Sequence, residues 1–376
     1  MTKTQRAKKI RVLIVDDSAI VRDLLAQGLS LDPEIEVIGK ATDAWSARDR
    51  IVLLQPDVIT LDIEMPGMDG IEFLRRLLPQ YPIPVLVVSS VTPEGSRRAL
   101  EALKAGAIDV VAKPDAKDRE GFAAMLAELV GKLKEATHAD ISKLRKLNTM
   151  IPTTRRPIVT APARKSNTQA RPAQFNGNGV NCLVAIGAST GGTAVLNTII
   201  PQFPAHMPGV VIVQHMPPVF TRLFAESLNR TSAMEVREAV NGDIVQQGLV
   251  LIAPGDFHMR VRKHGLQWRI ECTKGEKVSG HRPSVDVLFH SVAEVAGDRA
   301  IGVILTGMGK DGSAGLLAMR RNGAQCIAQD EETSVVFGMP KEAYENGAAR
   351  KLVPVSKLTT EILFMIAHRT EKRSVP

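Results

Sequence analysis

The sequence predicts an α/β protein with two domains, each built on a mostly parallel, doubly wound sheet with helices on both faces. Short apolar runs alternate with amphipathic stretches of helical length over residues 10–136, and again over residues 180–369. Between them, residues 137–179 lack this periodicity and are rich in Pro, Arg, Asn and Gly, which is typical of a flexible tether. The length of 376 residues agrees with two or three domains.

The first domain contains five predicted strands, each followed by a predicted helix. Its strands are apolar almost throughout, which is typical of parallel strands that are buried on both faces. The strands are expected at 10–15, 36–39, 58–61, 85–89 and 108–112, and the helices at 19–29, 44–54, 70–78, 95–104 and 120–133. Ligands of such sheets bind at the carboxyl ends of the strands, so the residues there are the candidates for a site.

Polar side chains occupy these strand ends. Asp16 and Asp17 follow the first strand, Asp62 follows the third, and Ser89 and Lys113 end the fourth and fifth. Two carboxylates about 4 Å apart repel by roughly 4 kcal/mol at an effective dielectric constant of 20, so three acids in one pocket call for a cation. Oxygen ligands suit Mg²⁺, and a carboxylate beside Mg²⁺ and a lysine can accept a phosphoryl group. The alternative is that the acids only cap helices, as Asp17 could do.

Residues 10–133 resemble the receiver domain of bacterial response regulators. The matching residues are Asp16-Asp17, Asp62 within Leu-Asp-Ile-Glu-Met-Pro-Gly-Met-Asp-Gly, Ser89 and Lys113-Pro114. The resemblance implies a flavodoxin-like domain in which a histidine kinase phosphorylates Asp62 with Mg²⁺ bound to Asp16, Asp17 and Asp62. It also implies that Ser89 and Lys113 contact the phosphoryl group. Receivers often have an aromatic residue three positions before the lysine, and Val110 at this position argues against a switch by an aromatic rotamer.

The net charge of +8 does not indicate a nucleic-acid-binding surface. Residues 132–171 contain ten Lys or Arg and two acids, so this segment alone carries +8 and the remainder of the chain sums to zero. Basic charge in a tether can contact an acidic partner or lipid headgroups, but we expect a solvated linker. Three scattered cysteines predict a reduced setting. With neither a signal peptide nor a run of about 20 apolar residues, we expect a cytoplasmic monomer without membrane insertion or a nucleic-acid partner.

The second domain opens on the stretch that carries its chemistry. The apolar run 182–186 leads into Gly187-Ala-Ser189-Thr-Gly191, and a helix-like run follows from 193 to 200. A strand, a tight turn and a helix in this order match the Gly-x-Ser-x-Gly pattern, which exposes a serine hydroxyl above a sheet edge. Further strands are expected at 210–214, 249–253, 300–305 and 325–328, with a hairpin over 260–262 and 266–272.

Two more strand ends of this domain carry groups that complement Ser189. His215 follows its second strand, and Asp311 lies in the loop after its fourth strand. Ser, His and Asp at one edge of a parallel sheet are the parts of a hydrolytic triad, with His215 as the base and Asp311 orienting it. The Thr190 N–H and the backbone around Met308 would then hold the oxyanion. Each residue alone has a simpler alternative: an N-cap for Ser189, a buried histidine for His215, and an N-cap of the following helix for Asp311.

A nucleotide site competes with the triad. Gly307-x-Gly309-x-x-Gly312 follows a strand and precedes a helix, and Asp330 lies near the offset expected of a ribose-binding acid. Such a fingerprint would make this a nucleotide-binding oxidoreductase domain. However, the motif lies late in its domain, and it gives Ser189 and His215 no role. The chain order Ser, His, Asp also differs from the Ser, Asp, His order of the α/β-hydrolases, which argues against that family.

Residues 180–366 resemble the catalytic domain of the chemotaxis protein-glutamate methylesterases. The matching segments are Gly-Ala-Ser-Thr-Gly-Gly (187–192), Gln-His-Met-Pro (214–217), Ala-Pro-Gly-Asp-Phe-His-Met (253–259), Arg-Pro-Ser-Val-Asp-Val-Leu-Phe (282–289), Thr-Gly-Met-Gly-Lys-Asp-Gly (306–312) and Val-Phe-Gly-Met-Pro (336–340). The resemblance implies Ser189, His215 and Asp311 as the triad, with Met308 as an oxyanion-hole amide and no cofactor. It also implies hydrolysis of glutamate γ-methyl esters on the cytoplasmic helices of chemoreceptors, and deamidation of receptor glutamine.

A receiver ahead of an esterase predicts regulation by docking. We expect the unphosphorylated receiver to pack over the edge that holds Ser189, and phosphorylation of Asp62 to shift the protein away from this packing. Two other classes stay open. An inactive esterase domain would act as a receptor-docking regulator, and a DNA-binding response regulator would need a helix-turn-helix after the linker. The sequence after the linker instead contains several predicted strands and no basic recognition helix.

Overall fold

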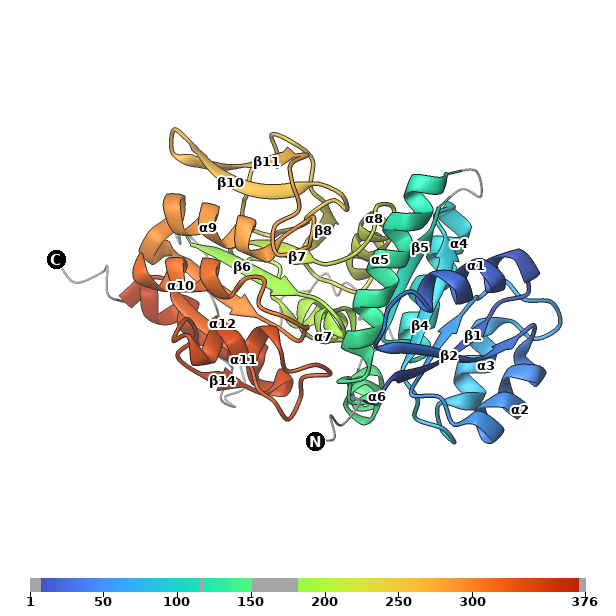
Figure 1. Cartoon of the computed structure of the whole chain (residues 1–376). Coiled ribbons are helices and arrows are strands. Elements are labelled where there is room, and N and C mark those ends of the chain that lie inside the picture. Colours follow the sequence, from blue (N-terminus) through green and yellow to red (C-terminus); the bar gives the residue numbers. More distant parts are fainter. Residues whose placement is uncertain (1–7, 115–117, 151–181, 372–376) are drawn as a thin grey trace, which may run out of the picture.

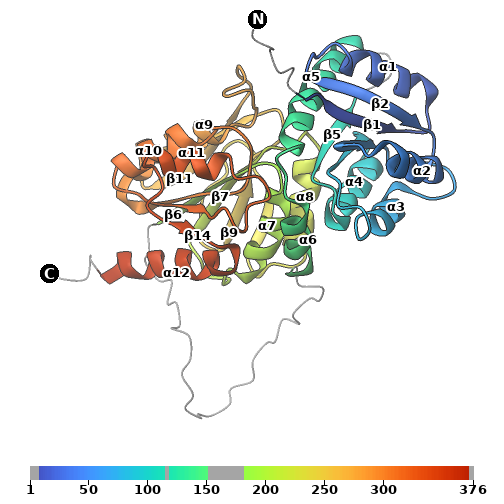
Figure 2. The ribbon, with the colours of Figure 1, turned by 60° about the horizontal axis from the view of Figure 1, so that its bottom comes forward.

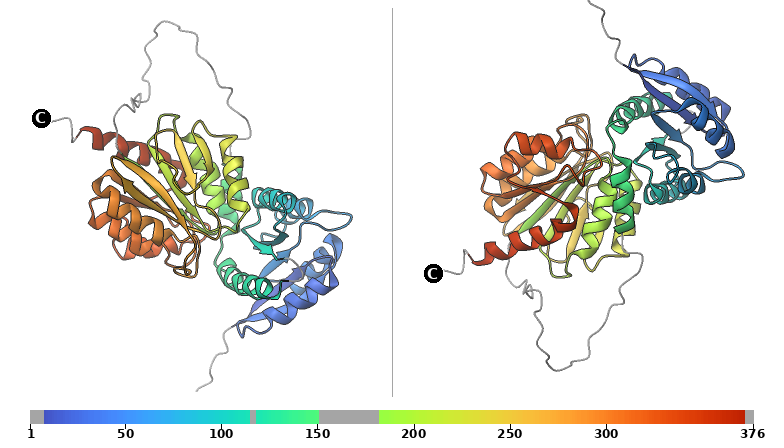
Figure 3. Two further views of the ribbon diagram at one scale, coloured as in Figure 1. Left: turned by 90° about the horizontal axis from the view of Figure 1, so that it is seen from above. Right: turned by 90° about the horizontal axis from the view of Figure 1, so that it is seen from below.

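The computed structural model describes residues 8–114, 118–150 and 182–371. Two α/β domains lie side by side, and helices α5 (Arg119–Ala136) and α6 (Ile141–Met150) run between their sheets (Figures 1 and 3). Within the described ranges, no helix combines the length and the apolar character needed to cross a membrane.

The N-terminal domain is a five-stranded parallel sheet in the order β2-β1-β3-β4-β5. Its remaining elements are β1 (Ile10–Val15), α1 (Ala19–Leu29), β2 (Ile35–Ala41), α2 (Ala44–Leu54), β3 (Val58–Leu61), α3 (Gly70–Leu77), β4 (Val85–Ser90), α4 (Pro93–Ala105) and β5 (Asp109–Lys113). The predicted alternation of strands and helices is confirmed. Every residue of β3 is buried, as the unbroken apolar run predicts for an inner parallel strand.

The C-terminal domain is a seven-stranded parallel sheet in the order β14-β13-β12-β6-β7-β9-β8. Its elements are β6 (Leu183–Ala188), α7 (Gly192–Ile199), β7 (Gly209–Gln214), α8 (Phe220–Asn229), β8 (Glu235–Glu238), β9 (Leu249–Ile252), α9 (Val285–Ala296), β12 (Ala300–Ile304), α10 (Ser313–Arg321), β13 (Gln325–Gln329), α11 (Met339–Glu345), β14 (Leu352–Val353) and α12 (Val355–Glu371). The predicted hairpin is confirmed as the antiparallel pair β10 (His258–His264) and β11 (Gln267–Thr273).

Two edge strands were not predicted from the sequence. Strand β8 reads Glu-Val-Arg-Glu, and β14 is only two residues long. A half-exposed charged edge strand lacks the continuous apolar run that identified the inner strands, and a two-residue strand is too short to show any period.

Ten residues of the expected linker form helix α6, which packs against the C-terminal domain beside α7 (Figure 2). Ile141, Leu144 and Leu147 recur at helical spacing and are all buried. The backbone N–H of Asp140 donates to the Val335 carbonyl at 2.9 Å, and the Lys143 ammonium donates to the Glu331 carbonyl at 2.8 Å. The first part of the linker therefore belongs to the folded body, and residues 151–179 lie outside the described residues.

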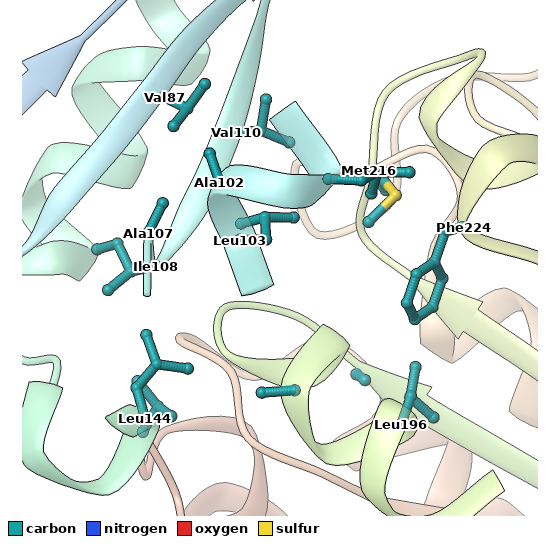
Figure 4. Packing of buried hydrophobic residues seen from close by; sticks show 14 of the residues in the cluster. Val87, Ala102, Leu103, Ala107, Ile108, Val110, Leu144, Leu196, Met216 and Phe224 are labelled. Carbon is teal, nitrogen blue, oxygen red and sulfur yellow. The ribbon is translucent and has the colours of Figure 1, made fainter. Parts of the chain in front are cut away.

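The two domains share one continuous apolar cluster. Figure 4 shows Leu103 and Val110 of the N-terminal domain on the side of Met216, with Leu144 of α6 and Leu196 of α7 below them in the same cluster. All five side chains are buried. A polar contact flanks the cluster, because the Lys104 ammonium of α4 donates to the Ser227 hydroxyl of α8 at 2.8 Å. Val110, at the position where an aromatic switch residue was considered, is thus fully buried beside the other domain.

Candidate active site and phosphoacceptor site

Ser189 lies in a tight turn at the carboxyl end of β6. Its backbone N–H donates to the Thr306 carbonyl at 3.0 Å, and the chain then passes through Gly191, whose φ of 78° is in the left-handed region, into α7. A Cβ atom on Gly191 would lie 2.6 Å from Cβ of Val335, and one on Gly192 would lie 2.3 Å from Oε1 of Gln214. The two glycines are therefore needed for the turn that holds the serine.

His215 follows β7, which pairs with β6, and it reaches both partners expected of a triad base. Its Nδ1 lies 3.0 Å from the Ser189 hydroxyl, and its Nε2 lies 2.8 Å from Oδ2 of Asp311. The three side chains are buried. The structure therefore brings together the three residues predicted from separate strand ends. The ring is turned relative to the serine-protease arrangement, in which Nε2 faces the serine.

Asp311 lies at the N-terminus of α9 rather than capping the helix that follows it in sequence. Its carboxylate accepts hydrogen bonds from the Ser284 hydroxyl at 2.7 Å, from the Val285 N–H at 2.7 Å and from the Asp286 N–H at 3.1 Å. Burial alone would raise the pKa of Asp311, but its bond to His215 and these donors lower the pKa to about 2. The N-cap of α10 is Gly312, so the simpler alternative for Asp311 is wrong.

Two loops of the sheet edge are joined beside Ser189. The Thr306 hydroxyl donates to the Thr190 carbonyl at 3.0 Å, which complements the bond from the Ser189 N–H to the Thr306 carbonyl. Among the described residues, no acceptor is found for the backbone N–H groups of Thr190 and Met308. Free amides on adjoining loops beside a serine hydroxyl are the arrangement that an oxyanion hole requires.

In the glycine-rich loop 307–312, Gly307 and Gly312 are packed against protein, whereas Gly309 faces open space. A Cβ atom on Gly307 would lie 2.7 Å from Cβ of Ser189 and 2.4 Å from Sδ of Met339. The Asp330 carboxylate accepts bonds from the N–H and the hydroxyl of Thr333, at 3.0 and 2.6 Å. Close packing at Gly307 and the bonds that hold Asp330 to its own loop favour the triad over the dinucleotide fingerprint.

A cavity of about 570 Å³ lies between the domains and opens onto Ser189 and His215. Helix α5 supplies its opposite wall, including Lys132 and Glu135. The receiver-like domain thus packs over the edge that holds Ser189, as the sequence predicts.

Direct hydrogen bonds link the N-terminal domain to the residue after Ser189. The Thr190 hydroxyl lies 2.8 Å from Oε2 of Glu135 and 3.2 Å from Oδ2 of Asp109. Burial raises the pKa of Glu135. The Lys132 ammonium pairs with Asp109 at 3.0 Å and with Glu128 at 3.2 Å, and these carboxylates raise its pKa although burial alone would lower it. Sequence reasoning missed this network, because no local pattern identifies contacts between domains.

The acids of the first domain also meet. Ligand oxygens of Asp16, Asp17 and Asp62 all lie within 4.8 Å of one another. The Lys113 ammonium donates to Asp16 at 2.7 Å and to Asp62 at 2.5 Å, and these two acids raise the pKa of Lys113 although burial alone would lower it. Burial raises the pKa of Asp16, with a further contribution from Asp62. Three clustered carboxylates are a donor set that fits Mg²⁺.

Ser89 is close to this edge but is engaged elsewhere. Its side chain is fully buried, and its hydroxyl donates to the Gly95 carbonyl of α4 at 3.2 Å. Within the described residues, no hydrogen bond joins Ser89 to Asp62. The Ser89 O–H must therefore turn away from the Gly95 carbonyl before it can donate to a group on Asp62.

One sheet ends in a cluster of aspartates suited to accept a phosphoryl group, and the other ends in the hydrogen-bonded side chains of Ser189, His215 and Asp311. Together these two sites define a response-regulator protein with a hydrolase-type output domain. Residues 12–121 match the response regulator receiver domain, and residues 184–362 match the CheB methylesterase family. The chain belongs to the CheB methylesterase family.

Two relatives that match nearly the whole chain support this assignment. A protein-glutamate methylesterase/protein-glutamine glutaminase of Syntrophotalea carbinolica is 53% identical over 96% of this chain and 99% of its own length. One of Sulfurimonas denitrificans is 49% identical, again over 96% of this chain and 99% of its own length. The crystal structure of the Thermotoga maritima CheB methylesterase catalytic domain is 42% identical, covers 50% of this chain and 98% of its own, and gives a TM-score of 0.48.

Proposed function

We propose that this protein hydrolyses glutamate γ-methyl esters on the cytoplasmic helices of chemoreceptors, releasing methanol, and deamidates receptor glutamine. The names of its relatives support the substrate class. The observation that carries the chemistry is the buried hydrogen-bonded chain from Ser189 through His215 to Asp311. We take residues 10–136 as the regulatory domain, 137–179 as the linker and 180–369 as the catalytic domain.

The proposed reaction has two stages. Oγ of Ser189 bonds to the γ-carbonyl carbon while its proton passes to Nδ1 of His215, and Asp311 stabilises the imidazolium that forms. The N–H groups of Thr190 and Met308 hold the oxyanion. The C–O bond to the methoxy group then breaks, and methanol leaves with the proton from His215. Water, deprotonated by His215, cleaves the acyl-enzyme to give glutamate and free Ser189; for glutamine, ammonia is the leaving group.

Phosphorylation would control access to this site. A histidine kinase is the phosphodonor, Asp62 is the acceptor, and Asp16, Asp17 and Asp62 hold Mg²⁺, which neutralises charge on the transferred group when bound. Lys113, and Ser89 after its O–H turns away from the Gly95 carbonyl, would contact the phosphoryl oxygens. Because α5 walls the cavity that opens onto Ser189, the receiver must shift for a receptor helix to reach the serine. We propose that the protein acts as a cytoplasmic monomer without a nucleic-acid partner.

Methanol release from purified methylated receptor tests the proposal. Ser189→Ala should release no methanol above background, whereas Ser232→Ala, remote from the cavity, should match the wild type. Mass spectrometry of the receptor before and after incubation would identify the converted glutamates and glutamines. Methanol release by Ser189→Ala at the wild-type rate would remove the triad. Phosphorylation of Asp62 with no methanol from the wild-type protein would instead support an inactive docking regulator.

A further inference from the structure

A second histidine covers the imidazole of the candidate triad. The ring of His281 stacks on the ring of His215, with 3.7 Å between the ring centroids and 10° between the ring planes. His281 also lines the cavity that opens onto Ser189. It precedes the Arg-Pro-Ser-Val-Asp segment that leads into α9, and the sequence analysis assigned it no role.

The backbone around His281 is built to hold this ring in place. Val278 and His281 exchange backbone hydrogen bonds of 3.1 and 2.9 Å, which close a two-residue turn. Both central residues are left-handed, Ser279 with φ 54° and Gly280 with φ 82°, as in a type I′ turn. A non-glycine residue in this conformation is strained and persists where the surroundings hold it. On the other side, Nε of Arg282 donates to Oδ1 of Asp256 at 2.9 Å.

The stack restrains a motion that the hydrogen bonds of His215 leave free. Ser189 and Asp311 bind opposite ring nitrogens, so both N···O distances are kept when the ring tilts about the line that joins Nδ1 to Nε2. The lone pair of Nδ1 lies in the ring plane but off that line, so such a tilt takes it out of its best alignment with the serine proton. A flat aromatic ring packed parallel against one face of His215 opposes it.

We propose that His281 is a positioning residue that holds the plane of the His215 imidazole for attack by Ser189; this rests on the proposed function. His281 binds neither Ser189 nor Asp311, and it acts through the ring that it covers. For this role His281 needs only a flat, neutral ring, and it does not act as a second base.

The surroundings of His281 keep its ring neutral. Burial lowers its pKa to about 3, with a further contribution from His215. The charged and titratable groups that act on it are His215 and Asp311 from the catalytic edge, Lys132 from α5 and Lys277 from its own loop. A cation at this position would repel the imidazolium of His215, whereas a neutral aromatic face is compatible with it.

The experiment uses the full-length protein and two replacements of similar size. His281→Phe keeps a flat ring, and His281→Leu fills the space without one. Phenylmethylsulfonyl fluoride is the first probe, because it is small enough for the cavity: the Oγ–S bond forms, the S–F bond breaks, the proton passes to His215 and fluoride leaves. Labelling of Ser189 is followed by intact-protein mass spectrometry, and methanol release from receptor gives kcat and KM. His264→Leu, an exposed histidine at the end of β10, is the matched control.

We expect His281→Leu to lower the labelling rate and kcat about tenfold with KM within twofold, and His281→Phe to restore both to within about threefold of the wild type. Equal labelling in the Leu variant and the wild type overturns the inference. So does a Phe variant as slow as the Leu variant, or an effect confined to KM. A wild-type protein that neither becomes labelled at Ser189 nor releases methanol overturns the proposed function itself, which separates the two failures.

Discussion

Asp16 and Asp311 are both buried carboxylates at the carboxyl ends of parallel strands, yet their pKa values shift in opposite directions. The pKa of Asp16 is raised by burial, and neighbouring Asp62 adds to the effect. The pKa of Asp311 falls to about 2, although burial opposes the shift there too. The difference lies in the donors: Asp16 shares the Lys113 ammonium with Asp62, whereas Asp311 receives hydrogen bonds from His215 and from the start of α9.

The comparison teaches that burial alone does not define a site. The receiver edge concentrates negative charge with one lysine against three acids, so it is electrostatically incomplete until a cation binds. The catalytic edge is complete within the protein, because the α9 N-terminus compensates the charge of Asp311 permanently. The receiver edge is therefore suited to a change of charge, whereas the catalytic edge keeps the fixed negative charge of Asp311 beside His215.

The largest expected effect comes from removing the fixed charge. Asp311→Asn should lower kcat for methanol release by about 10⁴, because an amide neither stabilises the imidazolium nor fixes the tautomer of His215. Asp298→Asn, just beyond the opposite end of α9, is the control and should match the wild type. Methanol release from receptor measures both. If kcat fell by less than tenfold in Asp311→Asn, the negative charge of Asp311 would not contribute to catalysis, although the N-terminus of α9 compensates it.

The second prediction concerns the receiver edge, whose charge changes when Mg²⁺ binds and Asp62 is phosphorylated. Asp62→Asn, or chelation of Mg²⁺ with EDTA, should abolish formation of the acyl phosphate from acetyl phosphate, detected as an added phosphoryl mass. Neither change should alter labelling of Ser189 by phenylmethylsulfonyl fluoride, since that edge contains its own compensating donors. Loss of Ser189 labelling after chelation would contradict the division of roles between the two edges.

The inner strands could be predicted because buried parallel strands have unbroken apolar sequences. The two site-bearing edges could be predicted because the carboxyl ends of parallel strands lie at the same edge of a sheet. The sequence paired Ser189 with Asp311 for this reason. It could not predict that the donors to Asp311 come from α9, or that Glu135 reaches Thr190. Both depend on which surfaces dock after the sheets form, and neither leaves a period or motif in the chain.

The third prediction tests the docked arrangement. Glu135→Ala removes one hydrogen bond between the domains, and a bond of this kind contributes about 0.5–1.5 kcal/mol. The unphosphorylated protein should therefore release methanol about two- to tenfold faster, while the phosphorylated protein changes little. Glu120→Ala, an exposed residue at the start of the same helix, is the matched control. A slower rate in Glu135→Ala would mean that this carboxylate assists the site instead of holding the receiver over it.

The smallest expected effect is on stability, and it returns to the two buried carboxylates. The folded pKa of Asp16 lies above that of the unfolded chain, about 3.9, so its contribution is full below pH 3.9 and is lost as pH rises through the folded value. For Asp311 the folded pKa of about 2 lies below the unfolded one, so its contribution is present above pH 3.9 and is lost as pH falls towards 2. At pH 7 without Mg²⁺, ionised Asp16 therefore costs stability.

Asp16→Asn should accordingly raise the Tm at pH 7 by on the order of 2 °C in the absence of Mg²⁺. The gain should be smaller at pH 4, because a larger fraction of Asp16 in the wild-type protein is protonated there than at pH 7, and Mg²⁺ should stabilise the wild type but not the variant. Calorimetry at both pH values, with and without the metal, measures all four conditions. A lower Tm for Asp16→Asn at pH 7 would mean that the pairing of the Asp16 carboxylate with Lys113 outweighs its burial and its repulsion by Asp62. The two edges would then differ in metal binding but not in charge balance.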